Sequence, residues 1–287
     1  MLSGWHDFML PSLIRDYNTL IKAGKQPYLT IGPWTHIGGA SAEVRFQEEI
    51  IWLRQHALNG NSLRETPVHI YVMGANEWRD LPTFPPESMN PQRWYLQPDC
   101  ILSLTIPPNS EPEHYQYDPS DPTPSVGGAS RFSGTGPAIQ DNRTLEARSD
   151  VLTFTTKELS SNLELIEPVE AELFIQSNQL YTDFFVRITD VEPSGKSINV
   201  CDGLQRLKLN PPIDESQKVT LKLSPIAYRF QSGHRIRIQV SSGSFPRWNR
   251  NLGTGEPLTT AKTMKVAEQT IYHDPNHPSA ILLPIND

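Results

Sequence analysis

Residues 1–36 read MLSGWHDFMLPSLIRDYNTLIKAGKQPYLTIGPWTH, and this stretch decides how the first part of the chain folds. Over 11–23 the apolar side chains recur at helical spacing. Pro11 suits the first turn of a helix, and Gly24 suits the position just after its end. The apolar run at 28–31 has the length of a buried strand. The stretch therefore predicts a helix over 11–23, followed by a buried strand.

The succession of helix and strand continues beyond this stretch. Gly32-Pro33 is expected to end the strand, and Ser41 is a plausible N-cap of a second helix that Gly60 closes. At 68–72, apolar and polar side chains then alternate with the period of a strand. The order helix, strand, helix, strand is typical of α/β proteins with a parallel sheet. We therefore predict that residues 1–86 form an α/β unit, as the C-terminal portion of a larger domain within which Met1 falls.

The remainder of the chain, residues 87–287, has a different pattern. Helical spacing disappears, and clusters of Pro, Gly, Ser and Asp separate short alternating runs. Residues 193–196 (PSGK) predict a turn between two of these runs. Many short strands at this spacing are typical of an all-β sandwich, and the jelly roll is the expected form. The clearest strand candidates are 171–176, 183–190, 219–223 and 235–240.

Composition excludes several classes of function. The chain has 287 residues and a formal net charge of −7, and it contains no basic run, so a nucleic-acid partner is not expected. No apolar stretch reaches the roughly 18–20 residues of a membrane-spanning helix. The two cysteines, Cys100 and Cys201, are expected to be separate thiols, and they favour a reducing, cytoplasmic compartment. The N-terminus lacks the features of a signal peptide.

Two motifs in the first region carry candidate catalytic groups. Gly4-Trp5-His6-Asp7 precedes the first helix, and Gly32-Pro33-Trp34-Thr35-His36 follows the buried strand. Functional groups of open α/β sheets collect beyond the carboxyl ends of the strands. An acid followed by a histidine is also the chain order of an α/β-hydrolase triad after its serine. Taken singly, Asp7 could be a helix cap and His36 an ordinary loop residue. A metal site at His6, Asp7 and His36 is disfavoured because the ligand spacing is unsupported.

The two motifs and several later ones resemble the CocE/NonD hydrolases and the related X-Pro dipeptidyl-peptidases. The match runs in order along essentially the whole chain, so chance is a poor explanation. Besides GWHD and GPWTH, the matching segments are VMG at 72–74, EWR at 77–79, YDP at 117–119, DPTP at 121–124, GG at 127–128, RSDVL at 148–152, TDF at 182–184, DV at 190–191, GHRI at 233–236, SS at 241–242 and FPR at 245–247.

This resemblance implies a serine acyl hydrolase with an α/β-hydrolase domain, an inserted cap and a C-terminal jelly roll of the galactose-binding-like kind. It makes Asp7 the triad acid and His36 the triad base, with no cofactor and no metal. The family's nucleophilic serine, oxyanion hole and cap precede the acid. The sequence contains no G-x-S-x-G elbow, since Gly39–Glu43 and Gly128–Phe132 both lack the closing glycine. The chain alone is therefore expected to be inactive.

Some positions near the motifs allow two interpretations. Trp5, Phe8, Met9 and Trp34 could line an acyl pocket or simply pack in the core. His6 stands where the family usually has Tyr or Phe, and an ordinary loop histidine is the simpler interpretation. Later in the chain, Asp183 and His234 are expected to bond backbone groups at the corners of the sandwich, and Trp78, Trp94 and Trp248 are not grouped in sequence.

The expected substrates are X-Pro peptides, carboxylic esters or acyl amides, and the sequence does not choose among them. An alternative function is a non-catalytic jelly-roll module for assembly or ligand binding, attached to a vestigial hydrolase segment. In either case residues 1–86 have too few strands to cover their own apolar faces. Self-association or pairing with an upstream complementary segment is therefore expected. Neither nucleic acid nor a membrane is an expected partner.

Overall fold

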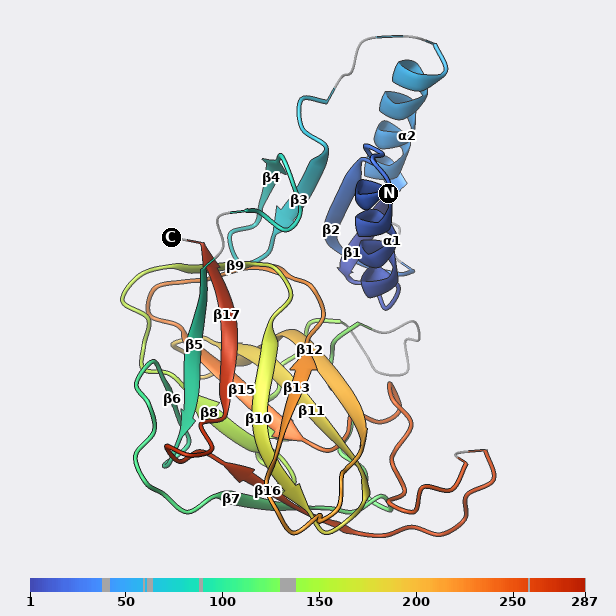
Figure 1. Cartoon of the computed structure of the whole chain (residues 1–287). Coiled ribbons are helices and arrows are strands. Elements are labelled where there is room, and N and C mark those ends of the chain that lie inside the picture. Colours follow the sequence, from blue (N-terminus) through green and yellow to red (C-terminus); the bar gives the residue numbers. More distant parts are fainter. Residues whose placement is uncertain are drawn as a thin grey trace.

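The computed structural model describes residues 1–37, 42–58, 60, 64–87, 90–129, 138–257 and 259–286. The first part alternates strands and helices, as its sequence predicts, and lies at one end of the molecule (Figure 1). Its elements are β1 (Leu2–His6), α1 (Leu10–Lys22), β2 (Leu29–Thr35), α2 (Ala42–His56), β3 (Val68–Val72) and β4 (Glu77–Leu81).

Helix α1 forms where its apolar spacing predicts. Pro11 lies in its first turn, and Leu10, Ile14 and Tyr17 are buried on one face. Gly24 follows the helix with φ of 70°, and its amide donates to the carbonyl of Ile21. A positive φ strains residues that carry a Cβ, which is why glycine suits this position.

Strands β1, β2 and β3 are parallel, and β4 pairs with β3 in the antiparallel sense. The prediction that Gly32-Pro33 ends β2 was wrong, because the strand continues to Thr35. The reason lies in the pairing. Strand β3 accompanies β2 only as far as Ile31, and beyond that point β2 pairs with β1 alone, across a bulge. Pro33 therefore lies beyond the part of β2 that pairs on both sides.

The second predicted helix is also present, as α2 (Ala42–His56). Its predicted N-cap, Ser41, lies outside the described residues. The side chains of α2 differ from those of α1 because none of them is buried. Phe46 and Trp52 are among its exposed aromatic residues, with 63% and 50% of their surface accessible. The helical spacing correctly predicted a helix here, but the apolar face that this spacing predicts is exposed to solvent.

The second part of the chain consists mainly of strands, as predicted. Its elements are β5 (Asn90–Gln97), β6 (Ile101–Ser103), β7 (Glu113–Tyr117), α3 (Arg143–Glu146), β8 (Leu152–Thr155), β9 (Leu163–Ile166), β10 (Glu170–Ser177), β11 (Tyr181–Val191), β12 (Ser197–Lys208), β13 (Gln217–Lys222), β14 (Ala227–Phe230), β15 (Arg235–Ser241), β16 (Ala267–Tyr272) and β17 (Ala280–Asn286). The predicted turn at 193–196 joins β11 to β12, with Gly195 at φ of 83°.

Most strands of this β domain form one continuous hydrogen-bonded path, β12-β11-β15-β8-β6-β5-β17-β10-β16-β7. Off this path, β13 pairs with β10, and β9 pairs with β14 and β17. Short β6 joins the two halves of the path, and Figure 1 shows β5, β17 and β10 passing in front of β8, β15 and β11. The residues between the halves are apolar. Phe154 on β8, Ile188 on β11 and Ile281 on β17 are fully buried in one core cluster. That cluster also includes Ile31 and Ile70 of the parallel sheet.

The turn between β3 and β4 attaches the parallel sheet to the β domain through main-chain hydrogen bonds. The amide of Met73 donates to the carbonyl of Ala227, and the amide of Arg229 donates to the carbonyl of Met73. Gly74 follows with φ of 77°, and a Cβ at this position would lie 2.1 Å from the carbonyl oxygen of Arg229. The backbones therefore approach too closely for any side chain.

Four charged side chains close a ring around this junction. Arg79 on β4 pairs with Glu77 and with Glu164 on β9. Arg229 on β14 pairs with the same two carboxylates, at 3.1 Å from Glu77 and 2.8 Å from Glu164. Each arginine therefore contacts both acids, and the ring fixes the β3–β4 hairpin against the β domain.

In the parts of the chain that the structure describes, no helix is long and apolar enough to cross a membrane. Cys100 is exposed and Cys201 is buried, and both are free thiols. The prediction of separate cysteines is therefore confirmed.

Candidate catalytic acid and base

Asp7 follows the carboxyl end of β1 in a tight turn. The amide of Asp7 donates to the carbonyl of Gly4 at 2.9 Å, and the amide of Leu10 donates to the carbonyl of Asp7 at 3.0 Å. Gly4 is required here, because a Cβ would lie 2.1 Å from the carbonyl oxygen of Trp34 on the neighbouring strand. The turn directs the chain from the strand into α1, and it places the carboxylate at the edge of the sheet.

His36 follows the carboxyl end of β2, the strand next to β1. Its Nδ1 lies 3.0 Å from Oδ1 of Asp7, and the exposed fractions of the two side chains are 38% and 12%. Because the strands are parallel and adjacent, their ends bring residues 29 positions apart into contact. With Nδ1 donating to the carboxylate, the lone pair of Nε2 is available to accept a proton. This is the arrangement that the acid and base of a hydrolase triad require.

Two further donors hold the Asp7 carboxylate. The amide of Met9 donates to Oδ1 at 2.8 Å, and the hydroxyl of Ser3 donates to Oδ2 at 3.1 Å. The expectation that Asp7 could be a simple helix cap is met in part, since it does bond an amide at the start of α1. The same oxygen nevertheless also contacts the imidazole, so capping and orientation of His36 coincide.

The structure separates the four candidate pocket residues into two pairs. The ring of Phe8 lies 4.7 Å from the ring of His36, and Phe8 and Met9 are 39% and 45% exposed. Trp5 is buried against Phe84, and its indole Nε1 donates to the carbonyl of Tyr71. Trp34 is buried as well. Phe8 and Met9 are thus exposed, with Phe8 beside His36, whereas the two tryptophans pack in the interior.

His6 is not the ordinary loop residue that its position in the sequence indicated. It is the last residue of β1 and is 3% exposed, and within the described residues its Nε2 has no hydrogen-bond partner. Burial lowers the pKa of His6 to about 4, and the nearby carboxylate of Asp202 only partly offsets that effect. His6 is therefore neutral at pH 7. Within the described residues no cluster suited to a metal ion was found, at His6 or elsewhere.

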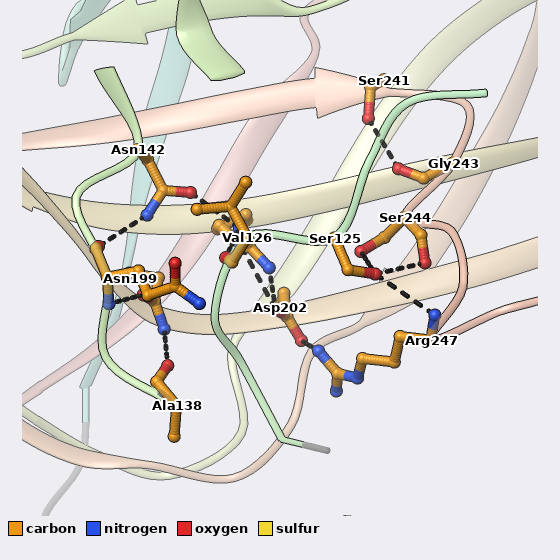
Figure 2. Close-up of polar contacts among 12 residues, drawn as sticks. Ser125, Val126, Ala138, Asn142, Asn199, Asp202, Ser241, Gly243, Ser244 and Arg247 are labelled. Atoms are coloured by element: carbon orange, nitrogen blue, oxygen red, sulfur yellow. Dashed lines mark hydrogen bonds and ion pairs between the residues drawn. The ribbon is translucent and has the colours of Figure 1, made fainter. Parts of the chain in front are cut away.

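A buried ionic network of the β domain lies near His6. Arg187 is fully buried and donates to Oδ2 of Asp202. Arg247 donates to the other carboxylate oxygen of Asp202, Oδ1, at 2.6 Å (Figure 2). Burial alone would raise the pKa of Asp202, but Arg247 and Arg187 outweigh it and keep the pKa below its usual value. Arg247 belongs to the FPR motif, but no pattern in the sequence indicated that Arg187 on β11 would bind the same carboxylate, Asp202.

Asp183 and His234, which were expected to bond backbone groups at the corners of the sandwich, have other partners. Asp183 forms an ion pair with Arg206 and accepts from Asn251, and His234 contacts Asp190 through Nδ1 at 2.8 Å. Both residues therefore bond side chains rather than backbone groups, because each faces a partner on a neighbouring strand or loop.

Comparisons with known proteins agree with this description. Residues 59–282 match the family model described as the X-Pro dipeptidyl-peptidase C-terminal non-catalytic domain. The chain is 32% identical to the cocaine esterase of Rhodococcus sp. (strain MB1 Bresler), in an alignment that covers 99% of this chain and 55% of that protein. The chain thus spans about half the length of the curated relatives that it matches.

Solved structures give the same result. An α-amino acid ester hydrolase labelled with selenomethionine superimposes with a TM-score of 0.88 and 25% identity, over 99% of this chain and 54% of its own. An aminopeptidase from a marine sediment archaeon, Thaumarchaeota archaeon, shares the fold with a TM-score of 0.86 and 24% identity, over 100% of this chain and 55% of its own.

The fold and these matches define the C-terminal part of a CocE/NonD-type hydrolase. The chain belongs to the X-Pro dipeptidyl-peptidase C-terminal domain family. The resemblance inferred from the ordered motifs is confirmed.

Proposed function

We propose that this chain supplies the acid and the base of a serine acyl hydrolase that cleaves carboxylic esters or related amides. The observation that carries the proposal is the 3.0 Å contact between Asp7 Oδ1 and His36 Nδ1 at the ends of adjacent parallel strands. Of the proteins named above, the cocaine esterase and the α-amino acid ester hydrolase are named for ester cleavage, and both are at least 25% identical to this chain. The aminopeptidase, at 24% identity, shares the fold, so esters are the preferred substrates of this proposal.

In this proposal each group has one task. The Asp7 carboxylate holds His36 in the Nδ1–H tautomer and stabilises the imidazolium that forms. Nε2 of His36 accepts the hydroxyl proton of a nucleophilic serine and later returns it to the leaving group. The acyl group passes first to that serine and then to water. Phe8, beside His36, contacts the apolar part of the substrate.

The serine comes from a segment other than residues 1–287, since no G-x-S-x-G elbow is present in this sequence. Two features support a covering segment on this side of the molecule. Within the described residues β1 pairs only with β2, and α2 has no buried side chain. The same segment would supply the oxyanion hole. In this proposal the β domain is a jelly roll that supports the catalytic sheet.

The test compares two proteins made in parallel, this chain and a longer product that includes the coding sequence upstream of Met1. A fluorophosphonate probe should label the longer protein but not this chain. Turnover of a p-nitrophenyl ester should likewise require the longer protein, and it should be lost in His36→Ala. Turnover by residues 1–287 that survives His36→Ala would falsify the proposal.

A second function is favoured by one observation. The family model that covers residues 59–282 describes a non-catalytic domain, and its range excludes Asp7 and His36. The β domain would then act in assembly or ligand binding. If the longer product contains no serine elbow and resists the probe, this second function replaces the first.

A further inference from the structure

The geometry points to Ser3 as a positioning residue that orients the Asp7 carboxylate toward His36. This inference rests on the proposed function, because it concerns the same acid and base. Its content is separate, since neither the motifs nor the comparisons assign a role to Ser3. The observation is the hydrogen bond of 3.1 Å from the Ser3 hydroxyl to Oδ2 of Asp7.

The path of the chain makes this contact unusual. A strand rises about 3.3 Å per residue, so residues four apart in an extended strand lie about 13 Å from each other. Here the strand register shifts between Gly4 and His6, and the amide of Asp7 turns back to the carbonyl of Gly4. The turn returns the carboxylate over the side chain of Ser3, which is 4% exposed.

Three donors share the two oxygens of the Asp7 carboxylate. Oδ1 accepts from Nδ1 of His36 and from the amide of Met9, and Oδ2 accepts from Ser3. The first two donors fix the position of one oxygen. The donor on the second oxygen fixes the plane of the carboxylate, and so the direction of the lone pair that faces the imidazole. Ser3 reaches the substrate only through Asp7, so it is a positioning residue and not a catalytic one.

The measurable consequence is the tautomer of His36. A carboxylate that is free to swivel holds the Nδ1 proton less well, and the Nε2–H tautomer becomes populated. Hydrogen bonds to charged groups contribute enough free energy that removing the Ser3 hydroxyl should lower the ratio of Nδ1–H to Nε2–H by about tenfold. Ser3→Thr keeps the hydroxyl and suits a strand, so it should restore the ratio.

The experiment uses this chain as it stands. Nitrogen chemical shifts of the imidazoles are measured at about pH 9, where an ordinary histidine is neutral. Loss of one signal set in His36→Gln assigns His36 among the eight histidines. The control is Thr30→Val, which removes another buried hydroxyl from the same sheet. Thr30 accepts from Arg64 and has no hydrogen bond to Asp7, so the His36 ratio should not change.

A ratio that is unchanged in Ser3→Ala, or that Ser3→Thr fails to restore, overturns the inference. If Ser3→Ala does not fold, the comparison moves to Ser3→Cys, whose thiol is a weak donor and should give an intermediate ratio. Equal His36 tautomer ratios in Ser3→Cys and Ser3→Thr would then overturn the inference. Failure of the proposed function would be recognised by a different result. Ester turnover by the longer protein would then survive Asp7→Asn, whatever the ratio of the His36 tautomers.

Discussion

At the scale of single residues, the candidate site shows how one carboxylate serves two purposes. Asp7 bonds an amide at the start of α1 and also contacts His36, so the loop that begins the helix also fixes the imidazole. The residue before it, His6, is buried on the side of the β domain. Neighbouring residues at the end of one strand therefore face different environments, and this makes their effects separable by substitution.

Asp7→Asn tests the acid in the longer, nucleophile-containing protein. The amide keeps the shape of the side chain but favours the wrong imidazole tautomer, so kcat for a p-nitrophenyl ester should fall by about 10⁴. Replacement of Asp16, an acid on the exposed side of α1, by Asn is the matched control, and it should leave kcat unchanged. Equal rates for Asp7→Asn and the parent protein would remove Asp7 from the mechanism.

The lowered pKa of His6 predicts how the stability of the folded chain depends on pH. Its pKa is about 4 in the folded chain against 6.5 for the free side chain. Between these two values the unfolded chain binds more protons, so the free energy of unfolding falls as the pH is lowered from 6.5 to 4. The full loss through His6 is about 3 kcal/mol.

His6→Phe should remove this part of the pH dependence, whereas replacement of exposed His56 by Gln should retain it. The measurement is urea unfolding at a series of pH values, which compares the slopes of the three proteins. A His6→Phe variant with the parent slope contradicts the prediction.

At the scale of elements, the β3–β4 hairpin is the main structural link between the sheet that carries the site and the β domain. Its turn adds backbone hydrogen bonds to β14, and the ring of Glu77, Arg79, Glu164 and Arg229 surrounds that contact. The EWR motif therefore has a structural explanation in this chain, since it contributes Glu77 and Arg79 to the ring. Separate substitutions test the backbone contact and the ionic ring.

Gly74→Ala tests the backbone contact. Both the positive φ and the 2.1 Å approach to Arg229 oppose a methyl group, so unfolding should become about 3 kcal/mol easier. Gly195→Ala is the matched control, because its φ is also positive but nothing lies within 4 Å of the added Cβ. Its cost should be about 1 kcal/mol. Chemical denaturation measures both, and equal costs would argue against the close approach.

Glu164→Gln tests the ring. The Glu164 side chain is 9% exposed and contacts both arginines, so its loss leaves two partly buried guanidinium groups with one acid. Stability should decrease by about 2 kcal/mol. Glu77→Gln should have a smaller effect, because water screens this half-exposed acid. The comparison uses denaturant unfolding at low salt, and an order reversed between the two variants would contradict the ring as described.

At the scale of the whole molecule, the two parts differ in how well they cover their apolar surface. The β domain closes around one core, whereas α2 leaves its apolar side chains in contact with solvent. A groove of about 570 Å³ lies between α2 and the start of β1, and Leu2, Trp52 and Leu53 are among the residues that line it. Uncovered apolar surface of this extent favours association.

We expect this chain alone to self-associate through α2 at concentrations in the tens of micromolar, as measured by light scattering. Polar substitution of Phe46, Trp52 and Leu53 together should shift it toward the monomer. The matched control substitutes three exposed apolar residues of the β domain, Ile101, Leu104 and Ile106, and should leave association unchanged. A monodisperse parent chain would contradict the expectation.

Much of this architecture was predictable because it depends on local pattern. Apolar spacing at 11–23 predicts α1, and alternation at 235–240 predicts β15, since each element buries one face of a regular period. The extension of β2 through Pro33 was not predictable, because it depends on which neighbour pairs with each half of the strand. The domain boundary at residue 86 stays a prediction, and the family match from residue 59 extends across it.

The sequence by itself determined the order of the elements, the family and the identity of Asp7 and His36 as candidates, because these depend on residue types and spacing along the chain. Only the tertiary structure decided that Ser3 contacts Asp7, that Trp5 is buried while Phe8 is exposed, and that Glu77 and Arg79 meet Glu164 and Arg229. Such contacts join residues through turns and strand pairing, so their geometry depends on the folded backbone and not on the local pattern.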